Sequence, residues 1–129
     1  MSDLADVRTA MAETLEAATG VKAYAYAPPL INPPAIFPAG VTVVPATQDT
    51  GRQITLSLWC CVAATHEQFQ VKLDEYVTGA ESVTEALDAT PDLGLGDVSA
   101  VWTEAGDYGL DEWAGTPLWV ARVTVEVSY

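Results

Sequence analysis

The sequence predicts a single α+β domain over residues 1–129, in which an antiparallel or mixed sheet of about four to five strands carries an N-terminal helix and two central helices. Three observations support this fold class. A chain of 129 residues that is 50% apolar is long enough to bury one hydrophobic core. Residues 52–63 and 118–129 alternate apolar and polar side chains, as strands do. The predicted order of elements is a helix, a hairpin, two helices and a second hairpin, which is typical of an α+β sandwich.

The first predicted element is a helix over residues 2–19. We expect Ser2 to cap its N-terminus and Gly20 to end it. Its apolar residues recur at spacings of three and four and form one stripe: Leu4, Val7, Met11, Leu15 and Ala18. A first strand is expected over residues 21–26.

Residues 28–38 contain five prolines, which exclude a helix interior and a central strand. We expect an ordered, extended segment along an edge of the sheet. This segment is either a rigid connector or a contact arm for a neighbouring chain. The second interpretation depends on four apolar residues that need covering: Leu30, Ile31, Ile36 and Phe37.

A short strand over residues 40–44, a polar turn region over 45–51 and the strand over 52–63 are expected to form a hairpin. The last of these strands places one set of apolar residues on a single face: Ile54, Leu56, Leu58, Cys60 and Val62.

Two helices are expected next. Thr65 and Gln68 form a capping-box pattern at the start of the first helix, and Ser82 and Glu85 form another at the start of the second, which Pro91 ends.

The C-terminal part predicts a strand over residues 97–103, an acidic loop over 104–117 and a final strand over 118–129. Trp113 lies in the predicted loop, where an indole either anchors a partner or packs under its own loop. The final strand is expected to turn five residues inward: Trp119, Ala121, Val123, Val125 and Val127.

The charge of the chain is strongly acidic, with 18 Asp and Glu against 5 Lys and Arg, a net charge of −13. Residues 73–121 hold eleven acids and no Lys or Arg, so we expect the charge to lie on one side of the molecule. Phosphate neutralisation and binding to anionic membranes both need basic clusters, which the sequence lacks. We also expect no signal sequence and no membrane span. The acidity is either a solubility surface or a surface that faces a polyanion without binding it.

The residues that usually carry chemistry form no recognisable site. His66 is the only histidine, and Cys60 and Cys61 are adjacent on a strand, so we expect two reduced thiols that point to opposite faces. The sequence has no CxxC or HExxH pattern, and its carboxylates lack the spacing of an EF-hand. We therefore expect no catalytic residue, no cofactor, no metal site and no enzymatic activity.

The order and spacing of several short pieces resembles the tail terminator proteins of long-tailed phages and the related neck and minor tail proteins. The resemblance covers nearly the whole chain and depends on no single signature. The pieces are the amphipathic helix ending at Gly20, Val21–Tyr26, Asn32–Ile36, Leu73–Tyr76, Ser82-Val83, Leu93-Gly94 and Gly115–Trp119.

The resemblance implies a homohexameric ring in the tail or neck of a virion, assembled in the cytoplasm of a bacterial host. Such a ring caps the head-proximal end of the tail tube, stops polymerisation of the major tail tube protein and joins the head-side connector or stopper protein, while DNA passes through the lumen without specific binding. Each subunit of a ring needs two different adhesive surfaces. We expect the proline segment and Trp113 to supply them, with Arg52 and Arg122 pairing with carboxylates of a neighbour.

Two other functions remain open. A head-to-tail stopper or adaptor would also form a ring, but it would join DNA-filled heads instead of purified tails. An acidic inhibitor or DNA mimic would stay monomeric and bind a basic partner with a steep dependence on salt.

Overall fold

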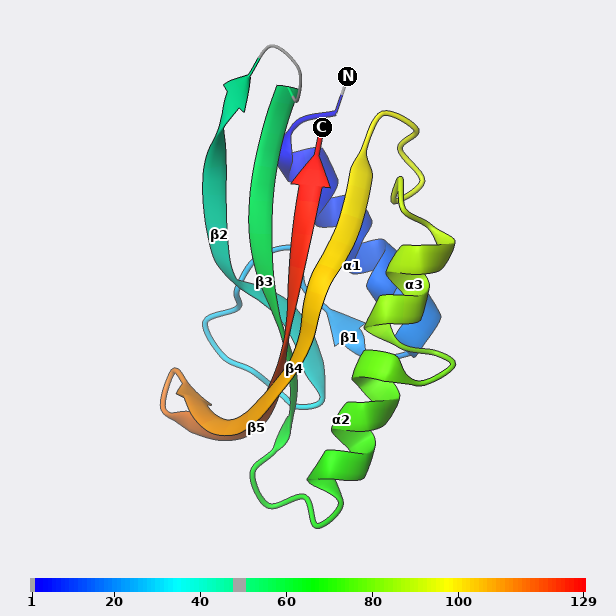
Figure 1. Ribbon diagram of the computed structural model, residues 1–129. Helices are drawn as coiled ribbons and strands as arrows, with labels where there is room; N and C mark the ends of the chain where they lie inside the picture. The colour runs from blue at the N-terminus through cyan, green and yellow to red at the C-terminus, as the bar shows by residue number, and fades with distance from the viewer. Residues whose placement is uncertain (1, 48–50) are drawn as a thin grey trace.

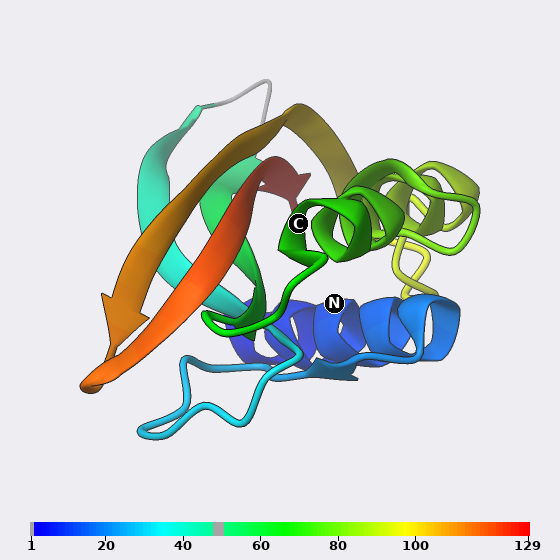
Figure 2. The same cartoon turned by 90° about the horizontal axis from the view of Figure 1, so that it is seen from below.

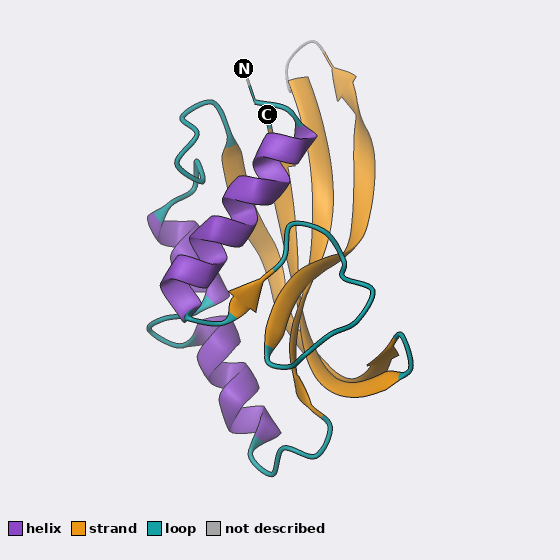
Figure 3. Ribbon diagram, turned by 180° about the vertical axis from the view of Figure 1, so that it is seen from behind, coloured by secondary structure: helices purple, strands orange, loops and turns teal. Residues whose placement is uncertain are grey.

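A computed structural model describes residues 2–47 and 51–129 and confirms the α+β class. Five strands form one mixed sheet in the order β1-β2-β3-β5-β4, and the helices pack on one of its faces (Figures 1 and 3). Strand β1 is parallel to β2, and the other neighbouring pairs are antiparallel. The elements are α1 (Leu4–Thr19), β1 (Lys22–Ala23), β2 (Ala35–Thr47), β3 (Gly51–Ala63), α2 (Phe69–Thr78), α3 (Val83–Ala89), β4 (Ser99–Trp113) and β5 (Thr116–Ser128).

Helix α1 is capped by Asp3, and the prediction that Ser2 caps it is wrong. The Asp3 carboxylate accepts the backbone N–H of Asp6 at 2.9 Å, and the Asp6 carboxylate accepts that of Asp3 at 3.1 Å. Two carboxylates suit the positive end of the helix dipole better than one hydroxyl does. Ser2 instead donates from its backbone N–H and its hydroxyl to Asp97, each at 2.7 Å. Gly20 ends the helix with φ 72°, as expected.

The strands around the proline segment differ from the prediction. Only Lys22–Ala23 of the expected strand over 21–26 pairs with β2, whereas β2 extends beyond the expected 40–44 in both directions. Pro38 fits within β2 because a register shift follows it and no strand lies beyond that part of the edge. Part of the expected turn over 45–51 is strand, and residues 48–50 lie outside the described residues.

The two central helices have different N-termini. Helix α2 begins at Phe69, and no side chain caps it, so the predicted Thr65–Gln68 box is wrong. The N–H of Gln68 is instead bound by His66 Nδ1 at 3.1 Å. Helix α3 begins as predicted, because Ser82 Oγ accepts the N–H of Glu85 at 3.3 Å.

Strands β4 and β5 form a long hairpin, so the predicted acidic loop over 104–117 is wrong. Its turn is short, with Ala114 and Gly115 at φ 52° and 83°. Register irregularities between Trp102 and Glu104, and between Gly106 and Gly109, interrupt the alternation by which a strand is recognised in a sequence. In Figure 1 the lower half of the hairpin curves away from the helices.

The sheet buries side chains on both faces. The main core lies between the helices and the sheet and includes all five residues predicted to line one face of β3. A second cluster lies on the opposite face, beneath the proline loop and the tip of the β4–β5 hairpin (Figure 2). It comprises Ile31, Ala35, Phe37, Cys61, Leu118 and Val120, with Tyr24, Ala39, Trp59 and Trp113 packed against it. Across the described ranges, no helix is long and apolar enough to cross a membrane.

Candidate functional site

The apolar residues of the proline segment pack mainly inside their own chain. Ile31, Ile36 and Phe37 are 7%, 1% and 0% exposed, so the expectation that a neighbouring chain covers them is wrong. Ile36 belongs to the main core, and the other two belong to the second cluster. Of the four, only Leu30 is exposed, at 73%. The segment therefore closes the back of the sheet, and Leu30 alone of the four remains a candidate contact.

Trp113 also packs within the chain. Its ring centroid lies 5.0 Å from that of Phe37 and 5.6 Å from that of Trp59, in a cluster of tilted and edge-on rings. Its indole N–H donates to the backbone carbonyl of Pro28 at 2.8 Å. Trp113 thus joins the hairpin tip to the proline loop, which is the second of the two roles expected for an indole in this region.

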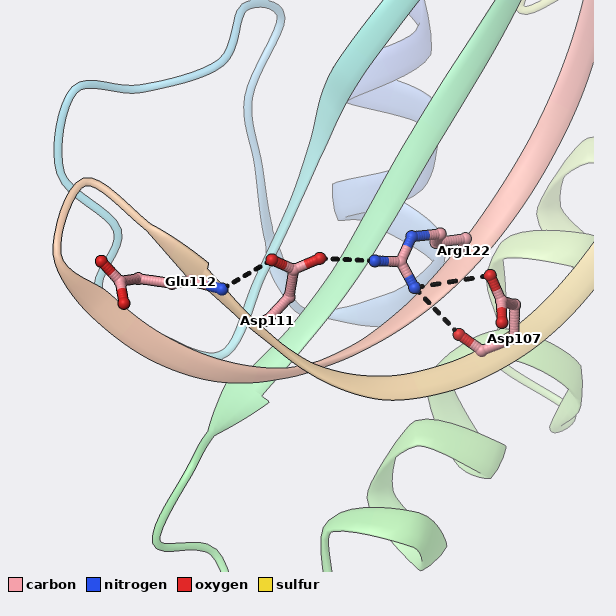
Figure 4. Close-up of polar contacts among 4 residues, drawn as sticks. All are labelled: Asp107, Asp111, Glu112 and Arg122. Atoms are coloured by element: carbon pink, nitrogen blue, oxygen red, sulfur yellow. Dashed lines mark hydrogen bonds and ion pairs between the residues drawn. The ribbon is translucent and has the colours of Figure 1, made fainter.

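Arg122 binds carboxylates of its own chain, so the expected pairing with a neighbour is not needed to satisfy it. Figure 4 shows its guanidinium between Asp111 and Asp107. Nη2 lies 2.6 Å from the Asp111 carboxylate, and Nη1 donates to the Asp107 carbonyl at 3.1 Å and lies 3.5 Å from its carboxylate. The guanidinium also lies 5.1 Å from the ring centroid of Trp59.

Trp59 is the residue that sequence reasoning missed at this place. It contacts both Trp113 and Arg122, two predicted contact residues on the two strands of the β4–β5 hairpin. The signal was its position on the otherwise polar face of β3. Arg52 lies elsewhere: its side chain is exposed at the start of β3, and its carbonyl accepts the N–H of Tyr129 at 3.0 Å. The predicted contact residues therefore do not form one surface.

The nucleophilic side chains are held in unreactive surroundings. Cys60 and Cys61 are both fully buried and point to opposite faces of the sheet. Burial raises the pKa of Cys60 from 9.0 to about 12 and also raises the pKa of Cys61. Among the described residues, no group of three or more His, Cys, Asp and Glu side chains could hold a metal ion.

The carboxylates of residues 73–121 are distributed over α2, α3, β4 and the segments that join them, and the lower part of β4 curves away from the helices in Figure 1. Nine of these eleven residues are exposed: Asp74, Glu75, Glu81, Glu85, Asp88, Asp97, Glu104, Asp107 and Glu112. Two of these carboxylates form hydrogen bonds that join the helices to β4. Asp88 accepts the indole N–H of Trp102 at 3.0 Å, and Asp74 accepts the hydroxyl of Tyr108. Burial, followed by the bond to this carboxylate, raises the pKa of Tyr108.

The sheet is open at both edges. Among the residues that the structure describes, β2 has no strand neighbour on its outer side beyond Ile36, and β4 is the last strand at the other end. Within the described ranges, the outer edge of β4 makes one backbone bond to another segment, from Ala100 N–H to Pro91 O at 2.7 Å. Exposed apolar side chains lie on both strands: Val43 on β2, at 70%, and Val101 and Leu110 on β4, at 54% and 61%.

The described residues therefore present the open edges of β2 and β4 and exposed surfaces. Their two buried thiols are protonated. No protein-family model matches the chain, and a search of curated proteins finds no match either.

Proposed function

We propose that this chain is a structural virion protein that forms a ring at the head-proximal end of a phage tail tube. It stops polymerisation of the tube and provides the joining surface to the head connector, while DNA passes through the ring. The observation that carries the proposal is the pair of open sheet edges. A ring requires each subunit to present two different surfaces, so that every contact is heterologous and the chain of contacts closes.

The buried clusters on both faces of the sheet support the same function. Both faces of the sheet are closed by the chain itself, the front by helices and the lower back by the proline loop and hairpin tip. A subunit with a finished core can add to a ring without refolding, which keeps the cost of association low.

The remaining back face of the sheet supports the passage of DNA. Above the second cluster, paired residues of the four long strands form polar rows: Gly40, Ser57, Thr124 and Glu104 in one, and Thr42, Thr55, Glu126 and Val101 in the next. These rows contain hydroxyls and carboxylates and no Lys or Arg. Such a surface repels phosphates weakly and forms no ion pair with them. We expect this face to line the lumen.

The test is electron microscopy of the protein mixed with the major tail tube protein of the same phage. The proposal predicts tubes of defined length with one capped end. Tubes of unlimited length with bare ends would overturn it. A protein that leaves tubes unchanged and joins DNA-filled heads would instead be a stopper or adaptor.

A matched pair of variants makes this test specific to the edges. Val43→Lys places a charge on the open edge of β2, and Val71→Lys places the same charge on the exposed face of α2, where Val71 is 53% exposed. Lysine on an edge strand opposes pairing with another strand. We expect the first variant to lose tube capping and the second to retain it.

A further inference from the structure

The two open edges of the sheet differ in charge. Strand β4 contains four acids, Glu104, Asp107, Asp111 and Glu112, and no Lys or Arg. Residues 20–47, which form β1, the proline loop and β2, contain no acid and one base, Lys22. In a chain with a net charge of −13, an acid-free stretch of this length at one edge is a pronounced asymmetry.

This asymmetry disfavours one of the ways in which two copies could pair. Joining β4 to β4 along the part of the strand above the second irregularity would bring the Glu104 carboxylates of the two copies to one seam, and like charges on facing strands are destabilising. Joining β2 to β2 would satisfy two edges and leave both acidic edges open, so assembly would stop at a dimer. Joining β2 to β4 avoids the repulsion and leaves one edge of each kind free to continue.

The strand directions are compatible with this third pairing. Since β2, β3, β5 and β4 are successively antiparallel, β2 and β4 run in opposite directions. Rotation about an axis roughly parallel to the strands preserves their directions in each copy. The β4 of one copy therefore meets the β2 of the next in antiparallel orientation, which is the pattern already present in most of the sheet.

We propose that copies of this chain join head to tail, with β2 of one copy paired to β4 of the next, so that their sheets form one continuous antiparallel sheet. This inference rests on the proposed ring function and specifies its partner surface. On β2 the pairing uses the residues between Pro38 and Pro45, because a proline has no N–H to donate. On β4 it uses Val101 to Gly106, between Ala100, whose N–H already donates to the Pro91 carbonyl, and the second irregularity.

The experiment is cross-linking with a short bismaleimide between variants that each carry one added cysteine. Thr42→Cys marks the β2 edge and Val101→Cys marks the β4 edge, since both residues lie on the same face of the sheet, and Val71→Cys on α2 is the matched exposed control. The native Cys60 and Cys61 are buried and do not compete. The two chains in each mixture carry tags of different size, and each mixture is tested alone and with the major tail tube protein.

Head-to-tail pairing predicts a cross-linked heterodimer from Thr42→Cys with Val101→Cys, at least tenfold more than from Thr42→Cys with Val71→Cys. A chain carrying both edge cysteines should give a ladder that ends at a closed ring. Homodimers of Val101→Cys alone, or equal yields with the α2 control, would overturn the proposal.

The two proposals fail separately. Capped tubes in which Thr42→Cys and Val101→Cys do not cross-link would overturn edge pairing and leave the tail function standing. Cross-linked rings that leave tubes uncapped would support edge pairing and overturn the tail function.

Discussion

Replacement of Trp113 tests whether this side chain stabilises its own domain or is reserved for a partner. In the structure it is half-buried, contacts the rings of Phe37 and Trp59, and donates to the carbonyl of Pro28. Trp113→Ala removes all three interactions and separates the hairpin tip from the proline loop. The loss should therefore appear in the stability of the isolated protein, before any assembly takes place.

The expected cost is the sum of three parts. Truncating a fully buried aromatic residue to alanine costs about 3–5 kcal/mol, so a half-buried one should cost about 2 kcal/mol. Two aromatic pairs contribute about 0.5–1 kcal/mol each beyond their buried area. The indole hydrogen bond to a partly hydrated carbonyl adds up to about 1 kcal/mol. We expect a loss of about 3–5 kcal/mol from the free energy of unfolding, a large share of the total for a domain of this size.

The measurement is urea unfolding followed by far-UV circular dichroism, because removing a tryptophan changes the fluorescence signal. Trp113→Phe keeps an aromatic ring at the site and loses the N–H donor, so it should cost about 1 kcal/mol. Leu30→Ala, at an exposed site of the same loop, should change stability by less than about 0.5 kcal/mol. If Trp113→Ala is no more destabilising than Leu30→Ala, the aromatic cluster does not hold the hairpin tip and the reasoning is refuted.

Three further outcomes follow from polar and titratable groups. Asp111→Asn should lower the free energy of unfolding by about 1–1.5 kcal/mol. Asp107→Asn should lower it by less than about 0.5 kcal/mol, because the Asp107 side chain is 75% exposed. Equal losses for the two variants in urea unfolding would contradict this. Neither Cys60 nor Cys61 should react with a thiol reagent at pH 8 until the protein unfolds. Burial raises the pKa of Cys60 from 9.0 to about 12. The contribution of its protonated thiol to the free energy of unfolding is therefore complete below pH 9 and is lost as the pH rises toward 12. Over this range the urea midpoint of Cys60→Ala should fall less steeply than that of the natural protein. Hydrogen bonds from the serine at position 2, first from its hydroxyl and then from its backbone N–H, lower the pKa of Asp97, so its contribution is present above the ordinary value of 3.8 and is lost as the pH falls below it. Urea midpoints of Asp97→Asn should fall less steeply in acid than those of the natural protein, and identical slopes would contradict this.

The fold class and most elements could be predicted from local patterns. The stripe of α1, the alternation of β3 and β5 and the Ser82 cap each depend on residues that are neighbours in the sequence, so the sequence alone reveals them. The extent of β4 could not be predicted, since two register irregularities and several glycines hide its alternation. A strand of this kind is stabilised by its partner β5, and the sequence of β4 carries little trace of that pairing.

The contact residues were harder to predict because exposure depends on the whole fold. Ile31 and Phe37 were assigned to an interface, since nothing in the proline segment shows that the hairpin tip returns to cover them. Arg122 was assigned a partner in another chain, although its partner Asp111 lies eleven residues before it, directly across the hairpin. The tail function itself remains a proposal.

The strand order has a consequence for how the protein is made on the ribosome. Strand β5 is synthesised last of the five, yet it lies between β3 and β4 and is the only strand that pairs with β4. A nascent chain that has emerged as far as Trp113 can form the β2–β3 hairpin and its helices, but β4 has no partner until Thr116–Ser128 follows. Completion of the sheet therefore waits for the synthesis of β5, and a chain that lacks β5 would expose one edge of β3 and the whole of β4 to the chaperones and proteases of the cell.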